Sequence, residues 1–217
     1  MPTELASGNL KSVDWFSAWM AYPGELSLLI RSAISHIRNQ LNQHLRNSFE
    51  LSEDVAIMSN ILEQDGTVVN GVSNKLLLFL VNVEKEDVGA RSGGSSGFGL
   101  DRGVVGRPPL FLNLYLMVAA NFTDYTESLK FLSNTVSFFQ RNPVLDHQNT
   151  PDMDRRITKL ALDIENMKLQ DLSTLWGALS GRYLPSILYK VRTIMVDSDD
   201  VGGLADTVRR AAPSVFR

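Results

Sequence analysis

Hydrophobic residues recur with the period of an α-helix over residues 25–46. They occupy positions 30, 34, 37, 41 and 45, at steps of three or four residues. This spacing places all five side chains on one side of a helix. The residues expected on its other faces are polar: Arg31, Arg38, Asn42 and Arg46. The segment is therefore predicted to be an amphipathic helix that packs one face on a core.

Five later segments have the composition of β-strands. Residues 54–70 are rich in β-branched side chains and contain a turn at Asp65–Gly66, and residues 185–196 form the last such segment. Residues 75–84 and 110–119 are so apolar that both faces must be buried, which predicts central strands. In RITKLALDIEN, Leu160, Leu162 and Ile164 alternate with Lys159 and Asp163, which is the pattern of a half-buried strand.

Two further helices are expected between these strands. The first runs from Asp124 to about Gln140, with Asp124 and Glu127 as a capping pair. Its expected apolar stripe is Leu129, Leu132, Val136 and Phe139, and Asn142–Pro143 should end it. The second is LQDLSTLWGALSG, with Leu172, Leu175, Trp176 and Leu179 turned inward and Gly181 as its stop. Residues 144–155 are expected to be a polar loop. This order of elements predicts an α+β fold, with a largely antiparallel sheet and helices packed on one face.

The amino-acid composition argues against several classes of protein. The 217 residues carry a formal net charge of −3 and include no cysteine. No basic block is present, so nucleic acid is not an expected partner. A disulfide scaffold and a thiolate metal site are excluded, which suits a protein made in the cytoplasm. No apolar run reaches the roughly 20 residues of a membrane-spanning helix, so direct membrane insertion is not expected.

The glycine-rich stretch GARSGGSSGFGLDRGVVGRPP, residues 89–109, has to be tested for chemistry. It contains no lysine for a phosphate loop, and its glycines do not fit the dinucleotide spacing. It does contain GxSxG around Ser95, and His147 with Asp124 or Asp146 would complete a triad. The strand and helix that should flank such a serine are missing from the pattern. A mobile loop over residues 89–107 is therefore favoured over a serine hydrolase, which remains the alternative.

Metal, cofactor and acid–base sites have little support. His36 and His44 are eight residues apart on the first helix, too far to share an ion, and are expected to be solvated. DSDDVGG at residues 197–203 lacks two ligands of a calcium loop. Asp163 and Glu165 share a face of a strand, where an ordinary exposed face is the simpler interpretation. We expect no cofactor, no metal and no enzymatic activity.

Several motifs in order resemble the cap, or tail-terminator, proteins of contractile injection systems of the antifeeding-prophage and virulence-cassette type. They are Arg107-Pro108-Pro109 before a buried strand, FFQRNPVLD, Leu175-Trp176, and YLPS at residues 183–186 followed by Tyr189. The resemblance covers about residues 25–197. It implies a phage tail-terminator-like domain there, between an N-terminal aromatic arm (1–24) and a C-terminal tail (198–217).

The resemblance also implies a task and partners. Such proteins form a six-fold ring on the baseplate-distal end of the tube and sheath, where they stop polymerisation. The expected partners are copies of the chain itself, the terminal tube and sheath subunits, and a second cap protein above them. An adaptor in a related phage-like or secretion assembly is a further alternative. The particle would assemble in the cytoplasm and then be either released or anchored to a membrane.

Three groups of residues are hypothesised to bind partners. The glycine-rich segment is either a docking loop or a plain hairpin connection, and the arm covers either its own domain or the next subunit. On the last strand, Lys190 and Arg192 share a face and are either solvated or contact an acidic sheath edge. The candidates are Trp15, Phe16, Trp19, Tyr22, Arg91, Phe98, Arg102, Arg107, Lys190 and Arg192.

Overall fold

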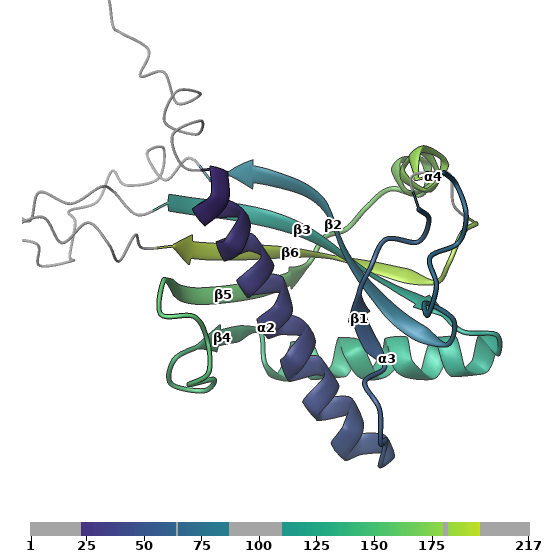
Figure 1. Ribbon diagram of the computed structural model, residues 1–217, viewed down its shortest axis with the longest axis horizontal. Coiled ribbons are helices and arrows are strands. Elements are labelled where there is room, and N and C mark those ends of the chain that lie inside the picture. The colour runs from purple at the N-terminus through teal and green to yellow at the C-terminus, as the bar shows by residue number, and fades with distance from the viewer. Residues whose placement is uncertain (1–22, 64, 87–109, 180–181, 196–217) are drawn as a thin grey trace, which may run out of the picture.

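The computed structural model describes residues 23–63, 65–86, 110–179 and 182–195, and shows an α+β fold. Its described helices are α2 (Pro23–Phe49), α3 (Tyr125–Arg141) and α4 (Leu169–Ala178). Its described strands are β1 (Ala56–Met58), β2 (Lys75–Lys85), β3 (Leu110–Asn121), β4 (Val144–Asp146), β5 (Ile157–Ile164) and β6 (Ser186–Met195). They form a strongly twisted sheet in the order β1-β2-β3-β6-β5-β4 (Figure 1). All pairs are antiparallel except β1 with β2, so the predicted fold class is confirmed.

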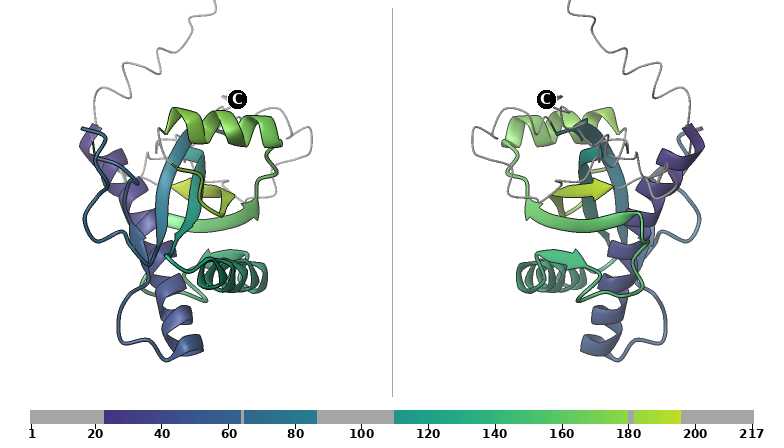
Figure 2. Two further views of the ribbon diagram at one scale, coloured as in Figure 1. Left: turned by 90° about the vertical axis from the view of Figure 1, so that its right-hand side faces the viewer. Right: turned by 90° about the vertical axis from the view of Figure 1, so that its left-hand side faces the viewer.

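The two faces of the sheet pack against different helices. Alternate residues of β2 and β3, such as Leu76, Leu78 and Leu114, join the apolar faces of α2 and α3 in one buried cluster. The intervening residues, such as Leu77 and Met117, form a second cluster with Trp176 of α4. Figure 2 shows α4 on the far side of the strands from α3. The expectation that all helices share one face therefore does not hold for α4.

Helix α2 has the apolar face that its periodicity predicts. Ile34, Ile37, Leu41 and Leu45 are buried in the first cluster, and Ile30 packs against it. The helix begins at Pro23, two residues before the predicted helical period and within the segment assigned to the arm. Proline is well suited to the first turn of a helix, where its missing N–H would have no partner.

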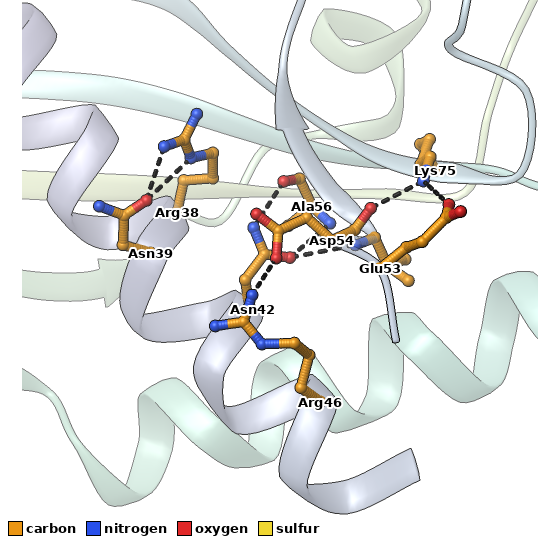
Figure 3. A network of polar contacts seen from close by, with 9 residues as sticks. Arg38, Asn39, Asn42, Arg46, Glu53, Asp54, Ala56 and Lys75 are labelled. Carbon is orange, nitrogen blue, oxygen red and sulfur yellow. Dashed lines mark hydrogen bonds and ion pairs between the residues drawn. The ribbon is translucent and has the colours of Figure 1, made fainter. Parts of the chain in front are cut away.

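The polar residue Asn42 is buried rather than solvated, because it completes the edge of the sheet (Figure 3). Its side-chain Nδ2 donates to the carbonyl of Ala56 at 2.8 Å. Its Oδ1 accepts from the N–H groups of Val55 at 3.1 Å and Ala56 at 2.8 Å. Since Asn42 supplies both a donor and an acceptor, it takes the place of a neighbouring strand beside β1.

Charged side chains on the surface contact the segment that leads into β1. Arg46 of α2 forms an ion pair with Asp54. Lys75, at the start of β2, donates to the carbonyl of Asp54 at 2.7 Å and lies 3.7 Å from a carboxylate oxygen of Glu53 (Figure 3). These exposed contacts orient the segment that leads from α2 into β1 and add little stability by themselves.

Helix α3 begins where predicted but buries a different face. The side chain of Asp124 caps its start by accepting from the N–H of Thr126 at 2.7 Å. Glu127 forms an ion pair with Lys130 instead of closing a capping box. The buried residues are Ser128, Phe131, Thr135, Phe138 and Phe139. Of the expected stripe, only Phe139 is buried, and Leu129 is 43% exposed.

Three smaller differences concern short elements. The expected loop 144–155 contains β4, which pairs with β5. Residues 54–70 contribute only β1 and an isolated bridge between Leu62 and Val68. Ile164 ends β5 with 42% of its surface exposed, although Leu160 and Leu162 are buried as expected. The expected stop at Gly181 lies outside the described residues.

Candidate partner-binding surface

Helix α4 covers only one end of its face of the sheet, and the other end carries polar side chains. We call this uncovered end the polar sheet face. It is formed by Asn82, Glu84, Asn113, Tyr115, Asp163, Lys190 and Arg192. The strand register aligns them in two rows across the sheet, because Tyr115 lies opposite both Asn82 and Lys190, and Asn113 lies opposite both Glu84 and Arg192. Asp163 extends the first row through its pairing with Lys190.

The side chains of this face contact one another across four strands. The hydroxyl of Tyr115 donates to Oε2 of Glu84 at 2.9 Å. The hydrogen bond to Glu84 is the main reason why the pKa of Tyr115 is raised, and partial burial adds to it. The ammonium of Lys190 lies 5.6 Å from the centre of the Tyr115 ring. The face is thus a layer of opposite charges around one aromatic ring.

Arg192 is an exposed cation on this face with a weak ion pair. Its guanidinium lies 3.5 Å from Oδ2 of Asp163, and the two side chains are 52% and 61% exposed. An exposed pair of this kind contributes at most about 1 kcal/mol. A carboxylate from another molecule can therefore replace Asp163 beside Arg192 at little cost.

Asn113 gives this face an unused acceptor. The residue is 5% exposed, and its Oδ1 has no hydrogen-bond partner among the described residues. It lies between Glu84 and Arg192 in the register of the sheet. A buried acceptor without a donor costs free energy, so a partner's N–H group is favoured here once the side chains that cover the acceptor move aside.

The described part of the chain ends at several points close to the polar sheet face. β2 leads into residues 87–109, β3 begins after them, and β6 leads into residues 196–217. These three strand ends lie at one end of the sheet, since Lys85 pairs with Leu112 and Leu110 pairs with Met195. Figure 1 places the start of α2 at this end too. The segments proposed to bind partners therefore join the domain beside the polar sheet face.

The candidate residues from the sequence divide into two groups. Lys190 and Arg192 lie on one face of β6, as predicted, and the structure adds their neighbours Tyr115, Glu84 and Asp163. The other candidates lie outside the described residues: Trp15, Phe16, Trp19, Tyr22, Arg91, Phe98, Arg102 and Arg107. The same is true of Ser95 and of residues 197–203. Asp163 was considered with Glu165, but its ion pair is with Arg192.

The remaining members of the hypothetical triad have structural tasks. Asp124 caps α3, and Oδ1 of Asp146 accepts from the backbone N–H groups of Gln148 and Asn149. The Nε2 atom of His147 lies 3.0 Å from the carbonyl oxygen of Ile157. Within the described ranges, no group of three His, Asp or Glu side chains is placed to hold a metal ion. No described helix is long and apolar enough to cross a membrane.

Two histidines expected to be solvated are packed instead. His36 is 7% exposed, and its Nε2 has no hydrogen-bond partner within the described part of the chain. Burial lowers the pKa of His36, and the nearby Asp152 only partly opposes this effect. His44 stacks on Phe138 at 4.7 Å between ring centres and lies 2.7 Å from Oδ1 of Asn134. Both side chains connect α2 to its neighbours in the fold.

The fold and the polar sheet face together define a structural class. A twisted, mostly antiparallel sheet has helices on both faces and carries charged side chains at the end of one face that α4 leaves uncovered. The family model for the Pvc16 N-terminal domain matches residues 33–210, most of the chain. The protein therefore belongs to the Pvc16 N-terminal domain family. No curated protein sequence matches this chain.

The solved structures similar to this chain include two terminators of injection particles. One is the anti-feeding prophage cap, described as the tube-terminating cap, with a TM-score of 0.52 and 16% identity over 82% of this chain and 59% of that one. The other is the sheath/tube terminator of an extracellular contractile injection system in the extended state, with a TM-score of 0.47 and 17% identity over 82% and 62%. The chain thus spans about three fifths of the length of each. The first similarity confirms the tail-terminator-like fold.

Proposed function

We propose that this protein is a structural cap that ends the tube and sheath of a phage-tail-like contractile injection particle. The observation that carries the proposal is the family match over residues 33–210, supported by the fold shared with the anti-feeding prophage cap. The protein acts through binding surfaces alone. Its partners are the last tube and sheath subunits, with a second cap protein above them.

Six copies of the chain form the cap. A closed ring needs two different surfaces on each copy, which meet head to tail. Six chains of 24.1 kDa would give a particle of about 145 kDa. Its formation should depend on protein concentration, because assembly follows mass action.

The polar sheet face contacts the terminal ring of the particle. Arg192 and Lys190 offer cations whose present contacts are weak or directed at an aromatic ring, and Asn113 offers an unused acceptor. A partner with carboxylates and free N–H groups fits this arrangement. Such contacts are screened by salt, so binding should weaken as ionic strength rises.

The first experiment compares particle lengths by electron microscopy with and without the gene for this protein. Overlong, ragged or missing tubes in the deletion strain are expected if the protein terminates polymerisation. Capped particles of normal length in that strain would remove the terminator function.

A second experiment tests the surface. Arg192→Glu should reduce the fraction of capped particles several-fold and should leave the folded domain intact. Lys168→Glu makes the same change of charge at an exposed site before α4, at the opposite end of the face, and serves as the control. Equal capping by both variants would exclude Arg192 from the interface.

A further inference from the structure

The outer edge of β2 is open over most of its length. β1 pairs only with Leu76–Leu78, whereas β2 continues to Lys85. On the outer side of Phe79–Lys85, no described residue pairs with the strand. Such an edge is normally shortened, charged or covered, because it can add strands from other chains.

The backbone at this edge can accept a further strand. The N–H of Leu76 donates outward to Val55 at 2.9 Å, which shows the pairing that β1 supplies at the start of β2. Near the other end, the N–H of Glu86 donates inward to Phe111 at 3.0 Å. Because N–H groups alternate between the two sides of a strand, those of Val83 and Lys85 point outward.

Exposed apolar side chains accompany the open edge. Leu80 is 36% exposed and Val83 is 38% exposed. Both lie on the α2 face of the sheet, since they pair with the buried residues Leu116 and Leu114. Leu28, near the start of α2, is 53% exposed. Apolar surface beside unpaired backbone favours a covering segment.

The N-terminal segment joins the domain at the level of this edge. Asn42 contacts Ala56 and Ser35 contacts Met58, so α2 runs antiparallel to β1 and β2. From Ser35 back to Pro23, α2 rises about 18 Å. From Leu78, the partner of Met58, forward to Val83, β2 advances about 17 Å. Pro23 therefore lies about level with Val83, and Figure 1 draws the start of α2 and the end of β2 at the same end of the sheet.

We propose that residues 13–22 of the same chain pair with the outer edge of β2 and place their aromatic side chains over Leu80 and Val83. The segment VDWFSAWMAY contains no proline and only one charged residue, Asp14. At about 3.3 Å per residue, its ten residues span about 33 Å, enough to reach and follow the open edge. Its attachment at Pro23 gives it an effective concentration on the order of millimolar, so it outcompetes arms of separate molecules.

Disulfide trapping tests the proposal directly, because the natural chain contains no cysteine. The variant Ser17→Cys/Leu80→Cys, in the full chain under mild oxidation, should form a disulfide within one molecule, because residue 17 of an extended arm reaches back from the level of Val83 toward Leu80. Ser17→Cys/Leu169→Cys is the control, since Leu169 is 81% exposed and lies on α4 at the other end of the molecule. Cross-linking no faster than in this control would overturn the proposal.

Mixing the two single-cysteine variants separates the chain's own arm from that of a neighbour. A disulfide formed mainly between molecules would assign the edge to a neighbouring arm and overturn the proposal. The readout needs only the isolated protein, so it does not depend on whether the protein caps a particle.

Amide hydrogen exchange provides a second measurement. In the unmodified chain, the amides of Val83 and Lys85 should exchange at least tenfold more slowly than in Trp15→Ala/Trp19→Ala. The amide of Glu86, which bonds inward, should change little and serves as the internal reference. Equal exchange at Val83 and Lys85 in both proteins would contradict the strand pairing.

Discussion

Replacing Asn42 by alanine tests whether one side chain holds the edge of the sheet. The substitution removes three hydrogen bonds, from Asn42 to the carbonyl of Ala56 and from the N–H groups of Val55 and Ala56 to Asn42. Ala56 is fully buried and Val55 is 9% exposed, so water does not easily replace the lost partner.

The size of the effect follows from the groups left behind. A buried backbone donor or acceptor without a partner costs about 1–3 kcal/mol. Three such groups that relax together should lower the free energy of unfolding by about 3–5 kcal/mol. Alanine is the better helix former by roughly 0.5 kcal/mol, which offsets a small part of this loss.

Urea unfolding followed by circular dichroism measures the difference. Asn47→Ala is the control, because it makes the same substitution at an exposed position of α2. It should be neutral or slightly stabilising. A loss below about 1 kcal/mol for Asn42→Ala, with an unchanged denaturant slope, would show that the three hydrogen bonds do not determine the stability of this edge.

Two further predictions concern the helices. Burial lowers the pKa of His36, so the imidazole binds a proton more readily in the unfolded chain than in the folded one. The neutral His36 side chain therefore contributes its full stability above pH 6.5, and this contribution falls as pH drops below that value. The free energy of unfolding should therefore be smaller at pH 5 than at pH 7. This difference should be reduced in His36→Gln. An equal loss of stability in His36→Gln would show that other titratable side chains cause the pH dependence. Asp154, whose pKa is lowered chiefly by its hydrogen bond to Arg156, stabilises the fold fully at both of these pH values, because its contribution is lost only as pH falls below 3.8. Asp124→Ala should lower the free energy of unfolding by about 1 kcal/mol, because it removes the cap of α3. Thermal denaturation measures the difference, with Ser133→Ala, an exposed substitution on the same helix, as the control. An Asp124→Ala midpoint equal to that of the control would show that the cap is unimportant.

Helix α3 shows why a correct element can have an incorrect face. Its sequence carries two overlapping apolar stripes, one through Leu129 and Leu132 and one through Phe131 and Phe138. Periodicity does not distinguish them. The aromatic stripe is buried because Phe131 stacks on Phe122 and meets Phe49, contacts that join three separate segments of the chain.

The polar sheet face was only partly predictable for a similar reason. Strand alternation places Lys190 and Arg192 together, because the side-chain period is a property of a single strand. Their neighbours Glu84 and Tyr115 come from β2 and β3, and only the pairing register aligns them. The sequence of one strand contains no information about which residue lies opposite.

The sequence by itself determined the α+β class, the buried strands β2 and β3 and the apolar face of α2, because each depends on the spacing of residues within one segment. The tertiary structure decided the burial of Asn42 and His36, the face of α3 that enters the core and the placement of α4 on the opposite side of the sheet. These features depend on partners distant in the chain. A polar side chain in a helix can be buried only where the fold brings it the correct neighbour, as β1 does for Asn42.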